Sequence, residues 1–153
     1  MLQSVKKVRA AKSRGTFAIV ASRYNTRYVD GMLNAAVREL RRSGAKVQIV
    51  RVPGAYEIPV VAARLSTLGS RLSAIICLGV ILRGATTHAQ HIGEAVSDAL
   101  MQIQVQHGVP VIHEVLLLEN HEQAEARCLD PKHNRGVEAA QTAMEMARVM
   151  ASL

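Results

Sequence analysis

Residues 74–82 read Ala-Ile-Ile-Cys-Leu-Gly-Val-Ile-Leu and form the longest apolar run in the 153-residue chain. The run is far shorter than the ~20 residues that a helix needs to cross a bilayer, and it has the length of a strand. A strand that is apolar on both faces is typical of the centre of a parallel sheet, where helices cover each side. We therefore predict that residues 74–82 form a buried central strand.

Strand and helix patterns alternate on both sides of this run. Further strands are expected over residues 16–22, 47–52 and 109–118. Helical spacing of apolar residues predicts helices over residues 29–40, 58–68, 92–103, 121–128 and 136–151, with Gly44, Gly69 and Gly108 as stops. Strands that alternate with helices form right-handed crossovers and a parallel sheet. The sequence predicts a three-layer α/β/α sandwich of flavodoxin-like type with four parallel strands.

Composition restricts the class of protein. Hydrophobic residues make up 49% and charged residues 20% of the chain, which excludes a wholly disordered protein. Residues 16–153 have the size of a single domain, preceded by a basic arm over residues 1–15. That arm lacks the apolar segment of a secretory signal, and Cys77 and Cys128 are too few for a disulfide framework. We expect a cytoplasmic protein that does not enter a membrane.

The formal net charge of +7 suggests an anionic partner. Five basic residues and no acidic residue lie in the first fifteen positions, so the rest of the chain is only slightly basic. The chain has three Tyr, one Phe and no Trp, which leaves little for a stacking platform that binds single strands. Nucleic-acid binding is therefore disfavoured, and the arm is expected to be solvated or to face a partner.

Polar residues follow three of the predicted strands. They are Arg23-Tyr24-Asn25, then Pro53-Gly54-Ala55-Tyr56-Glu57, then Arg83-Gly84-Ala85-Thr86-Thr87-His88. Ligands of open parallel sheets bind outside the carboxyl ends of the strands. The loops bring two of the three tyrosines to this edge. The sequence therefore predicts a small-molecule site there.

Each polar loop has a functional and a structural interpretation. Residues 85–87 open a helix and suit a phosphate cradle, or Thr86 or Thr87 is simply its N-cap. His88 suits general acid–base chemistry, although a histidine at a helix start is often structural. His88 and His91 lack a third ligand at a recognisable spacing, so no metal is expected. Phosphate-loop and dinucleotide glycine motifs are absent from the sequence.

Other candidates are equally open on their own chemistry. Glu57 suits hydrogen bonding to a polyol, or it favours the start of the next helix through the helix dipole. Tyr24 suits stacking on a flat ring, or it packs its own loop. Arg127 and Arg135 suit a phosphate, or they lie on a solvated helix face.

Taken together, these motifs resemble the lumazine synthase family. The resemblance rests on residues 22–25 (Ser-Arg-Tyr-Asn), 52–59 (Val-Pro-Gly-Ala-Tyr-Glu-Ile-Pro) and above all 79–88, which end in Arg-Gly-Ala-Thr-Thr-His. Residues 108–112, 122–127 and 134–136 match in the same order, so the similarity runs from about residue 16 to the C-terminus.

The resemblance implies the penultimate step of riboflavin biosynthesis. Family members condense 5-amino-6-(D-ribitylamino)uracil with 3,4-dihydroxy-2-butanone 4-phosphate and use no metal or organic cofactor. By position, His88 would transfer protons and Tyr24 would stack on the pyrimidine. The remaining roles would be ribityl binding by Ala55, Tyr56 and Glu57, backbone contacts to the pyrimidine from Val80, Ile81 and Leu82, and phosphate binding by Ala85, Thr86 and Arg127.

The family builds this site between neighbouring subunits of a pentamer, and the neighbour contributes position 113. This chain has His113 where Phe is usual, Glu114 beside it where Gly is usual, Arg135 where Lys is common, and Gln90 where an acid often follows the catalytic histidine. His113 and Arg135 are nevertheless expected to contact substrate. An imidazole still stacks, and its protonation would make that contact depend on pH.

Assembly is a further implication of the resemblance. Some members stop at the homopentamer and others form an icosahedral capsid of twelve pentamers; the short 128–134 loop favours the capsid without deciding the question. Riboflavin synthase is a candidate partner. Two alternatives to the enzyme stay open: a flavin-binding carrier or shell that has lost turnover, and an anion- or RNA-binding assembly that uses the arm.

Overall fold

The computed structural model describes residues 2–6, 12–67 and 71–153. Its centre is a four-stranded parallel sheet in the order β2-β1-β3-β4. The strands are β1 (Thr16–Ser22), β2 (Lys46–Val52), β3 (Ala74–Leu82) and β4 (Val111–Leu118). The predicted central strand, β3, pairs with β1 on one side and β4 on the other.

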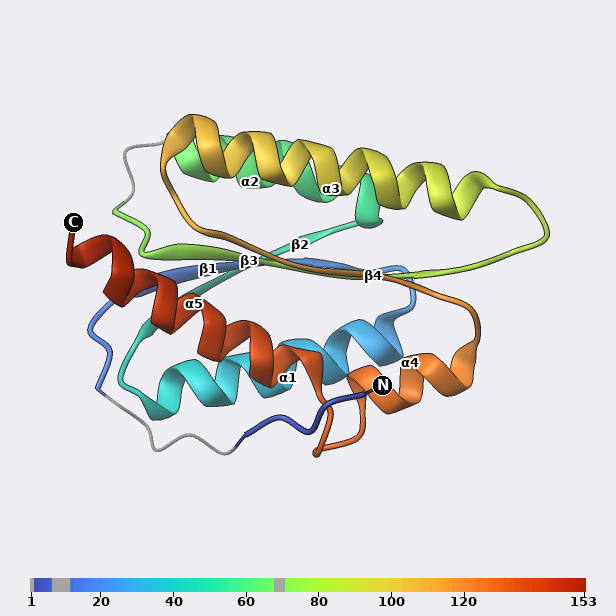
Figure 1. Cartoon of the computed structure of the whole chain (residues 1–153), viewed down its shortest axis with the longest axis horizontal. Coiled ribbons are helices and arrows are strands. Elements are labelled where there is room, and N and C mark those ends of the chain that lie inside the picture. The colour runs from blue at the N-terminus through green and yellow to red at the C-terminus, as the bar shows by residue number, and fades with distance from the viewer. Residues whose placement is uncertain (1, 7–11, 68–70) are drawn as a thin grey trace.

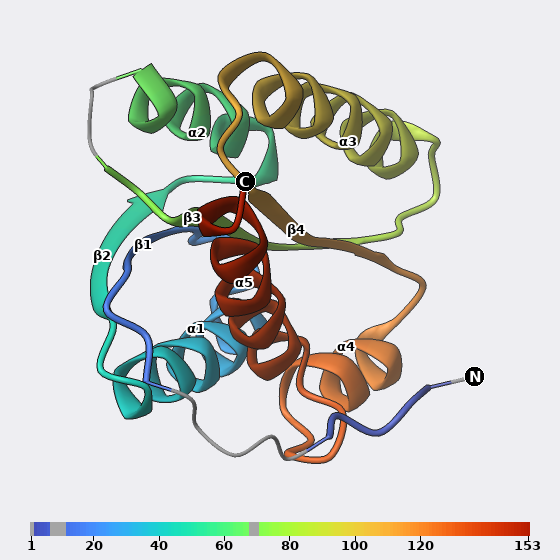
Figure 2. The ribbon, with the colours of Figure 1, turned by 60° about the vertical axis from the view of Figure 1, so that its left-hand side comes forward.

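Helices cover both faces of the sheet (Figures 1 and 2). One face carries α2 (Ile58–Thr67) and α3 (His88–His107), with a short turn η1 (Ala55–Glu57) ahead of α2. The other face carries α1 (Thr26–Arg42), α4 (His121–Cys128) and α5 (Arg135–Ala151). The predicted three-layer α/β/α flavodoxin-like architecture is confirmed.

The alternation of side chains along β3 explains why the strand is apolar throughout. Ile76 and Leu78 belong to the core beneath α1 and α5, whereas Ile75 and Cys77 belong to the core beneath α2 and α3. All four are fully buried. Burial also raises the pKa of the Cys77 thiol to about 12, so this cysteine is a small buried apolar residue.

Five predicted starts are wrong. α1 begins three residues before the predicted 29 and α3 four before the predicted 92, because their first turns lie outside the apolar spacing. The other three starts are wrong by one or two residues. β4 begins at Val111 instead of residue 109, because Pro110 has no N–H for the ladder and the Val111 amide donates to the Gln104 side chain. β2 begins one residue early, at Lys46. α5 begins at Arg135 because the Asn134 side chain caps it by accepting from the Gly136 amide at 2.8 Å.

Glycines end two helices as predicted. Gly44 and Gly108 adopt positive φ of 89° and 62° just beyond α1 and α3. The predicted stop at Gly69 lies outside the described residues. A third glycine, Gly136, lets α5 approach α1, since a Cβ there would overlap the Met32 carbonyl.

The described start of the N-terminal arm lies against the chain's own α5 layer. The Val5 amide donates to the Lys132 carbonyl at 2.8 Å, and Gln141 Nε2 donates to the Lys6 carbonyl at 2.9 Å. Within the described residues, no helix combines the length and apolarity needed to cross a membrane.

Candidate active site

The first cavity lies where β1, β2 and β3 end, and its volume is about 830 Å³. Eight of the predicted site residues line it together: Tyr24, Ala55, Tyr56, Glu57, Val80, Ile81, Leu82 and His88. Tyr24 and Tyr56 are 67% and 65% exposed, so both rings stand at the mouth of the cavity. The structure therefore gathers at one edge the loops that the strand pattern placed there.

Asn25 fixes the first of these loops, and sequence analysis did not single it out as a site residue. Its Nδ2 donates to the Val80 carbonyl at 2.7 Å, while its backbone adopts a positive φ of 57°. The Tyr24 amide donates to the Pro53 carbonyl at 2.9 Å, and the Tyr24 ring packs against Gly54. The sequence signal that could have identified Asn25 is its residue type, because asparagine tolerates a positive φ better than most residues.

The sequence left two interpretations of Glu57 open, a ligand-binding carboxylate or a group that stabilises the start of the next helix, and the structure has a feature that agrees with each. One carboxylate oxygen, Oε2, accepts from the Gly54 amide at 3.0 Å and so caps the η1 turn. The side chain is nevertheless exposed and lines the cavity. Its other oxygen remains available to a ligand hydroxyl.

His88 begins α3, which places its side chain on the cavity wall. The preceding Thr87 occupies the N-cap position without a side-chain cap bond, and its hydroxyl lies 3.3 Å from His91 Nε2. Thr86 Oγ1 instead accepts a long bond, 3.4 Å, from the His88 amide. Ala85 and Thr86 are exposed beside His88 but do not line the cavity.

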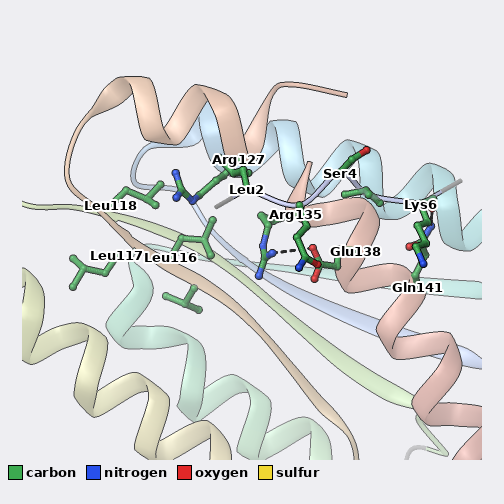
Figure 3. A pocket seen from close by; sticks show the side chains of 13 residues that line it. Leu2, Ser4, Lys6, Leu116, Leu117, Leu118, Arg127, Arg135, Glu138 and Gln141 are labelled. Atoms are coloured by element: carbon green, nitrogen blue, oxygen red, sulfur yellow. Dashed lines mark hydrogen bonds and ion pairs between the residues drawn. The ribbon is translucent and has the colours of Figure 1, made fainter. Parts of the chain in front are cut away.

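A second cavity of about 720 Å³ lies over β4 on the α5 side of the sheet (Figure 3). Arg127 from α4 and Arg135 from α5 line it, together with residues 2–6 and the end of β4. Arg135 Nη1 pairs with Glu138 at 2.8 Å, whereas Arg127 Nη1 donates to the Gln123 carbonyl at 3.4 Å and has no ion pair with a described carboxylate. The two cavities share none of their described lining residues, so one chain does not bring His88 and the arginines together.

Glu114 lies behind Arg135 and is 7% exposed. Its Oε2 accepts from Arg135 Nε at 3.2 Å. Burial raises the pKa of Glu114 to about 7; Arg135 opposes this increase and the nearby Glu138 adds to it. Glu114 is thus a carboxylate whose charge changes near neutral pH.

His113 lines neither cavity and faces α3. Its Nε2 lies 2.7 Å from Ser97 Oγ, and its Nδ1 accepts from the Val115 amide at 3.1 Å. Because Ser97 Oγ already donates to the Gly93 carbonyl, His113 is neutral with its proton on Nε2. Burial lowers the pKa of His113, in agreement with this state.

In the described part of the chain, no three His, Cys, Asp or Glu side chains come together as a metal site.

A buried parallel sheet with a cavity at the carboxyl ends of its strands defines a flavodoxin-like α/β protein whose cavity suits a small molecule. The sequence profile of the 6,7-dimethyl-8-ribityllumazine synthase family matches residues 14–151. The chain belongs to this family.

Individual relatives agree with the profile. The 6,7-dimethyl-8-ribityllumazine synthase of Stenotrophomonas maltophilia (strain R551-3) is 41% identical over 140 residues, 90% of each chain. Proteins of the same name from Xanthomonas oryzae pv. oryzae (strain PXO99A) and Xanthomonas campestris pv. campestris (strain B100) are 42% and 41% identical over 137 residues, 88% of each chain.

Proposed function

We propose that the chain condenses 5-amino-6-(D-ribitylamino)uracil with 3,4-dihydroxy-2-butanone 4-phosphate at a site that two copies complete. Family membership makes the chain a transferase of riboflavin biosynthesis. The observation that carries the two-copy site is the division of the expected residues. One cavity holds His88 with aromatic and carboxylate groups, and a separate cavity holds Arg127 and Arg135.

The first cavity suits the pyrimidine substrate. Tyr24 offers a ring face at its mouth, and Glu57 has a free carboxylate oxygen for ribityl hydroxyls. The backbone of residues 80–82 offers polar groups to the pyrimidine edge, with the Val80 carbonyl already oriented by Asn25. These groups support binding of a flat ring that carries a polyol chain.

The second cavity suits the phosphate of the other substrate. Guanidinium groups bind phosphate oxygens through paired, charge-assisted hydrogen bonds, and Arg127 lacks a carboxylate partner among the described residues. If a neighbouring copy brings this cavity beside residues 85–88, the phosphate would meet Ala85 and Thr86 from one copy and Arg127 from the other.

Imine formation, phosphate elimination and ring closure each need protons to move between oriented reactants: water leaves as the C=N bond forms, phosphate leaves as the adjacent carbon loses a proton, and a second water leaves as the ring closes. His88 and His91 both lie in the first turn of α3 and line the cavity, and His88 is the one that directly follows the Arg-Gly-Ala-Thr-Thr motif. We assign it the proton transfers. Holding the two substrates close together in the reacting orientation supplies the larger part of the acceleration, because the reaction joins two molecules.

The proposal includes assembly into rings of five copies, with His113 of one copy stacking at its neighbour's site. Apolar side chains exposed on α2 and α3 support contact between copies: Val60, Met101 and Val105 are 68%, 58% and 74% exposed. Closure of twelve such rings into a capsid, a cytoplasmic location and riboflavin synthase as partner are finer parts of the same proposal.

The test is turnover of both substrates by the purified protein, followed by lumazine fluorescence. A reaction without protein is essential, because the two substrates also condense slowly on their own. Acceleration above this control is expected. Tight binding of riboflavin without acceleration would overturn the enzyme and favour a flavin-binding carrier or shell.

A further inference from the structure

Glu114 is a carboxylate in an otherwise apolar layer. On β4 it shares the face of Ile112 and Leu118, which belong to the core beneath α1 and α5. Its neighbour across the ladder is Leu78 of β3, which is fully buried. A charged group in such a layer is costly unless it has a partner, so its presence needs a specific reason.

The partner of Glu114 is the guanidinium of Arg135. Glu114 Oε2 accepts from Nε at 3.2 Å, and Glu138 Oε2 accepts from Nη1 at 2.8 Å. One carboxylate therefore comes from the strand and the other from the first turn of α5. The Asn134 cap fixes the start of that helix, so the backbone of Arg135 is fixed as well.

This arrangement leaves the remaining donors of Arg135 toward the cavity that Arg127 also lines (Figure 3). Glu114 itself does not line the cavity and lies behind Arg135. Glu138 on α5 is a further charged group near Glu114, while Arg127 on α4 and Lys6 of the arm line the cavity. Two guanidiniums at one cavity suit a single phosphate dianion.

We propose that Glu114 is a positioning residue: it holds the Arg135 guanidinium against β4 so that Arg135 and Arg127 bind one phosphate group together. The inference rests on the proposed function for the identity of that phosphate, which belongs to the butanone substrate. Glu114 contacts no substrate in this proposal and acts only through Arg135.

The pairing also explains why a carboxylate at position 114 accompanies a guanidinium at position 135 in this chain. An ammonium group is a point charge with freely rotating donors, whereas the guanidinium is a planar fork whose orientation must be fixed. Glycine at position 114 would leave the fork of Arg135 without an acceptor on β4. Glu114 and Arg135 are therefore expected to work as a pair and to be replaceable only together.

The test is a double-mutant cycle that measures binding of inorganic phosphate to the full-length, assembled protein by calorimetry. Glu114→Ala is expected to weaken binding about tenfold in the wild-type background and less than twofold when Arg135 is already Ala. Glu114→Gln keeps an acceptor oxygen and should rescue part of the loss. Equal weakening in both backgrounds, or none in either, would overturn the proposal.

A second comparison distinguishes loss of the Glu114–Arg135 pair from misfolding of the variant. Glu114→Gly combined with Arg135→Lys removes the carboxylate together with the guanidinium that needs it, and it should bind phosphate more tightly than Glu114→Gly alone. In turnover, Glu114→Ala should raise KM for the phosphate-bearing substrate and leave KM for the pyrimidine unchanged. If the double variant is no better than Glu114→Gly, or if both KM values rise together, the pairing is wrong.

The phosphate measurement separates this inference from the proposed function. Coupling between Glu114 and Arg135 in phosphate binding without any lumazine formation would overturn the proposed reaction and support the positioning role of Glu114. Turnover without coupling would support the proposed reaction and overturn the positioning role of Glu114. Failure of the wild-type protein to bind inorganic phosphate would overturn the two-arginine site itself.

Discussion

Asn25 Nδ2 donates a 2.7 Å hydrogen bond to the carbonyl of Val80, a residue 55 positions further along the chain. The bond joins the loop after β1 to the carboxyl half of β3. Because the Asn25 side chain is used in this way, it makes no cap bond to α1, although Asn25 occupies the N-cap position. The contact holds Tyr24 at the cavity, so the cavity's shape depends on a residue that touches no reacting group in the proposed mechanism.

Asn25→Ala and Asn25→Gly should separate the two roles of this residue. Alanine loses the hydrogen bond and must also adopt a positive φ, whereas glycine loses only the bond. We expect a loss of about 2 kcal/mol in the free energy of unfolding for alanine and about 1 kcal/mol for glycine. Urea titrations at one protein concentration measure both values; equal losses would contradict the backbone argument.

His88→Ala should slow the enzyme without abolishing it. General acid–base catalysis is worth about a hundredfold here, while substrate positioning by the rest of the cavity is untouched. Single-turnover rates with saturating substrates provide the measurement. His107→Ala, in the last turn of the same helix, is the matched control and should leave the rate unchanged. Complete loss of turnover with unchanged substrate affinity would count against the positioning argument.

Arg127→Ala should chiefly weaken the phosphate-bearing substrate. Loss of a charge-assisted hydrogen bond predicts a rise of about tenfold or more in KM for the butanone phosphate and little change for the pyrimidine. Arg148→Ala removes an arginine of α5 that pairs with Glu145 away from both cavities, and it serves as the control. A similar rise for both substrates would remove Arg127 from the phosphate site.

The fold followed from the sequence because its signals are local. The apolar run at β3 predicts a strand in those residues, and Gly44 and Gly108 each predict the end of the helix that precedes them. The loops at the carboxyl ends of β1, β2 and β3 then had to meet, and eight predicted residues do meet there. The errors lie at the ends of elements: Pro110 and Asn134 decide two of these boundaries, and the first turns of α1 and α3 lie outside the apolar spacing that predicted those helices.

The rest of the site depends on long-range contacts that no local pattern encodes. Asn25 contacts Val80 across the sheet edge, and Glu114 contacts Arg135 between a strand and a helix. The resemblance assigned Arg127 to the same site as His88, yet within one chain they line different cavities. That separation is a consequence of the fold, and local sequence patterns do not predict which cavity each residue lines.

Glu114→Gln should change how stability depends on pH. The pKa of Glu114 is about 7 in the folded protein and near 4.5 unfolded, so the folded state binds more protons between these values. Stability therefore falls as pH rises from about 4.5 through 7, by about 3 kcal/mol in total. Gln does not titrate, so the variant should lose this decline. Urea unfolding at pH 5 and pH 8 tests it; a decline of the same size in the variant would assign the effect to another group.

Mixing two impaired variants tests whether the site lies between copies. In an assembly of His88→Ala chains with Arg127→Ala chains, some interfaces join an intact His88 cavity to an intact Arg127 cavity. Random mixing at equal amounts makes about one quarter of the interfaces wild type. The mixture, formed by refolding the two chains together, should therefore exceed the mean activity of the separate variants. Chains refolded separately and then combined are the control. If co-refolded chains show only the mean activity, while mixed assemblies are demonstrated by mass, His88 and Arg127 do not serve one site across the interface.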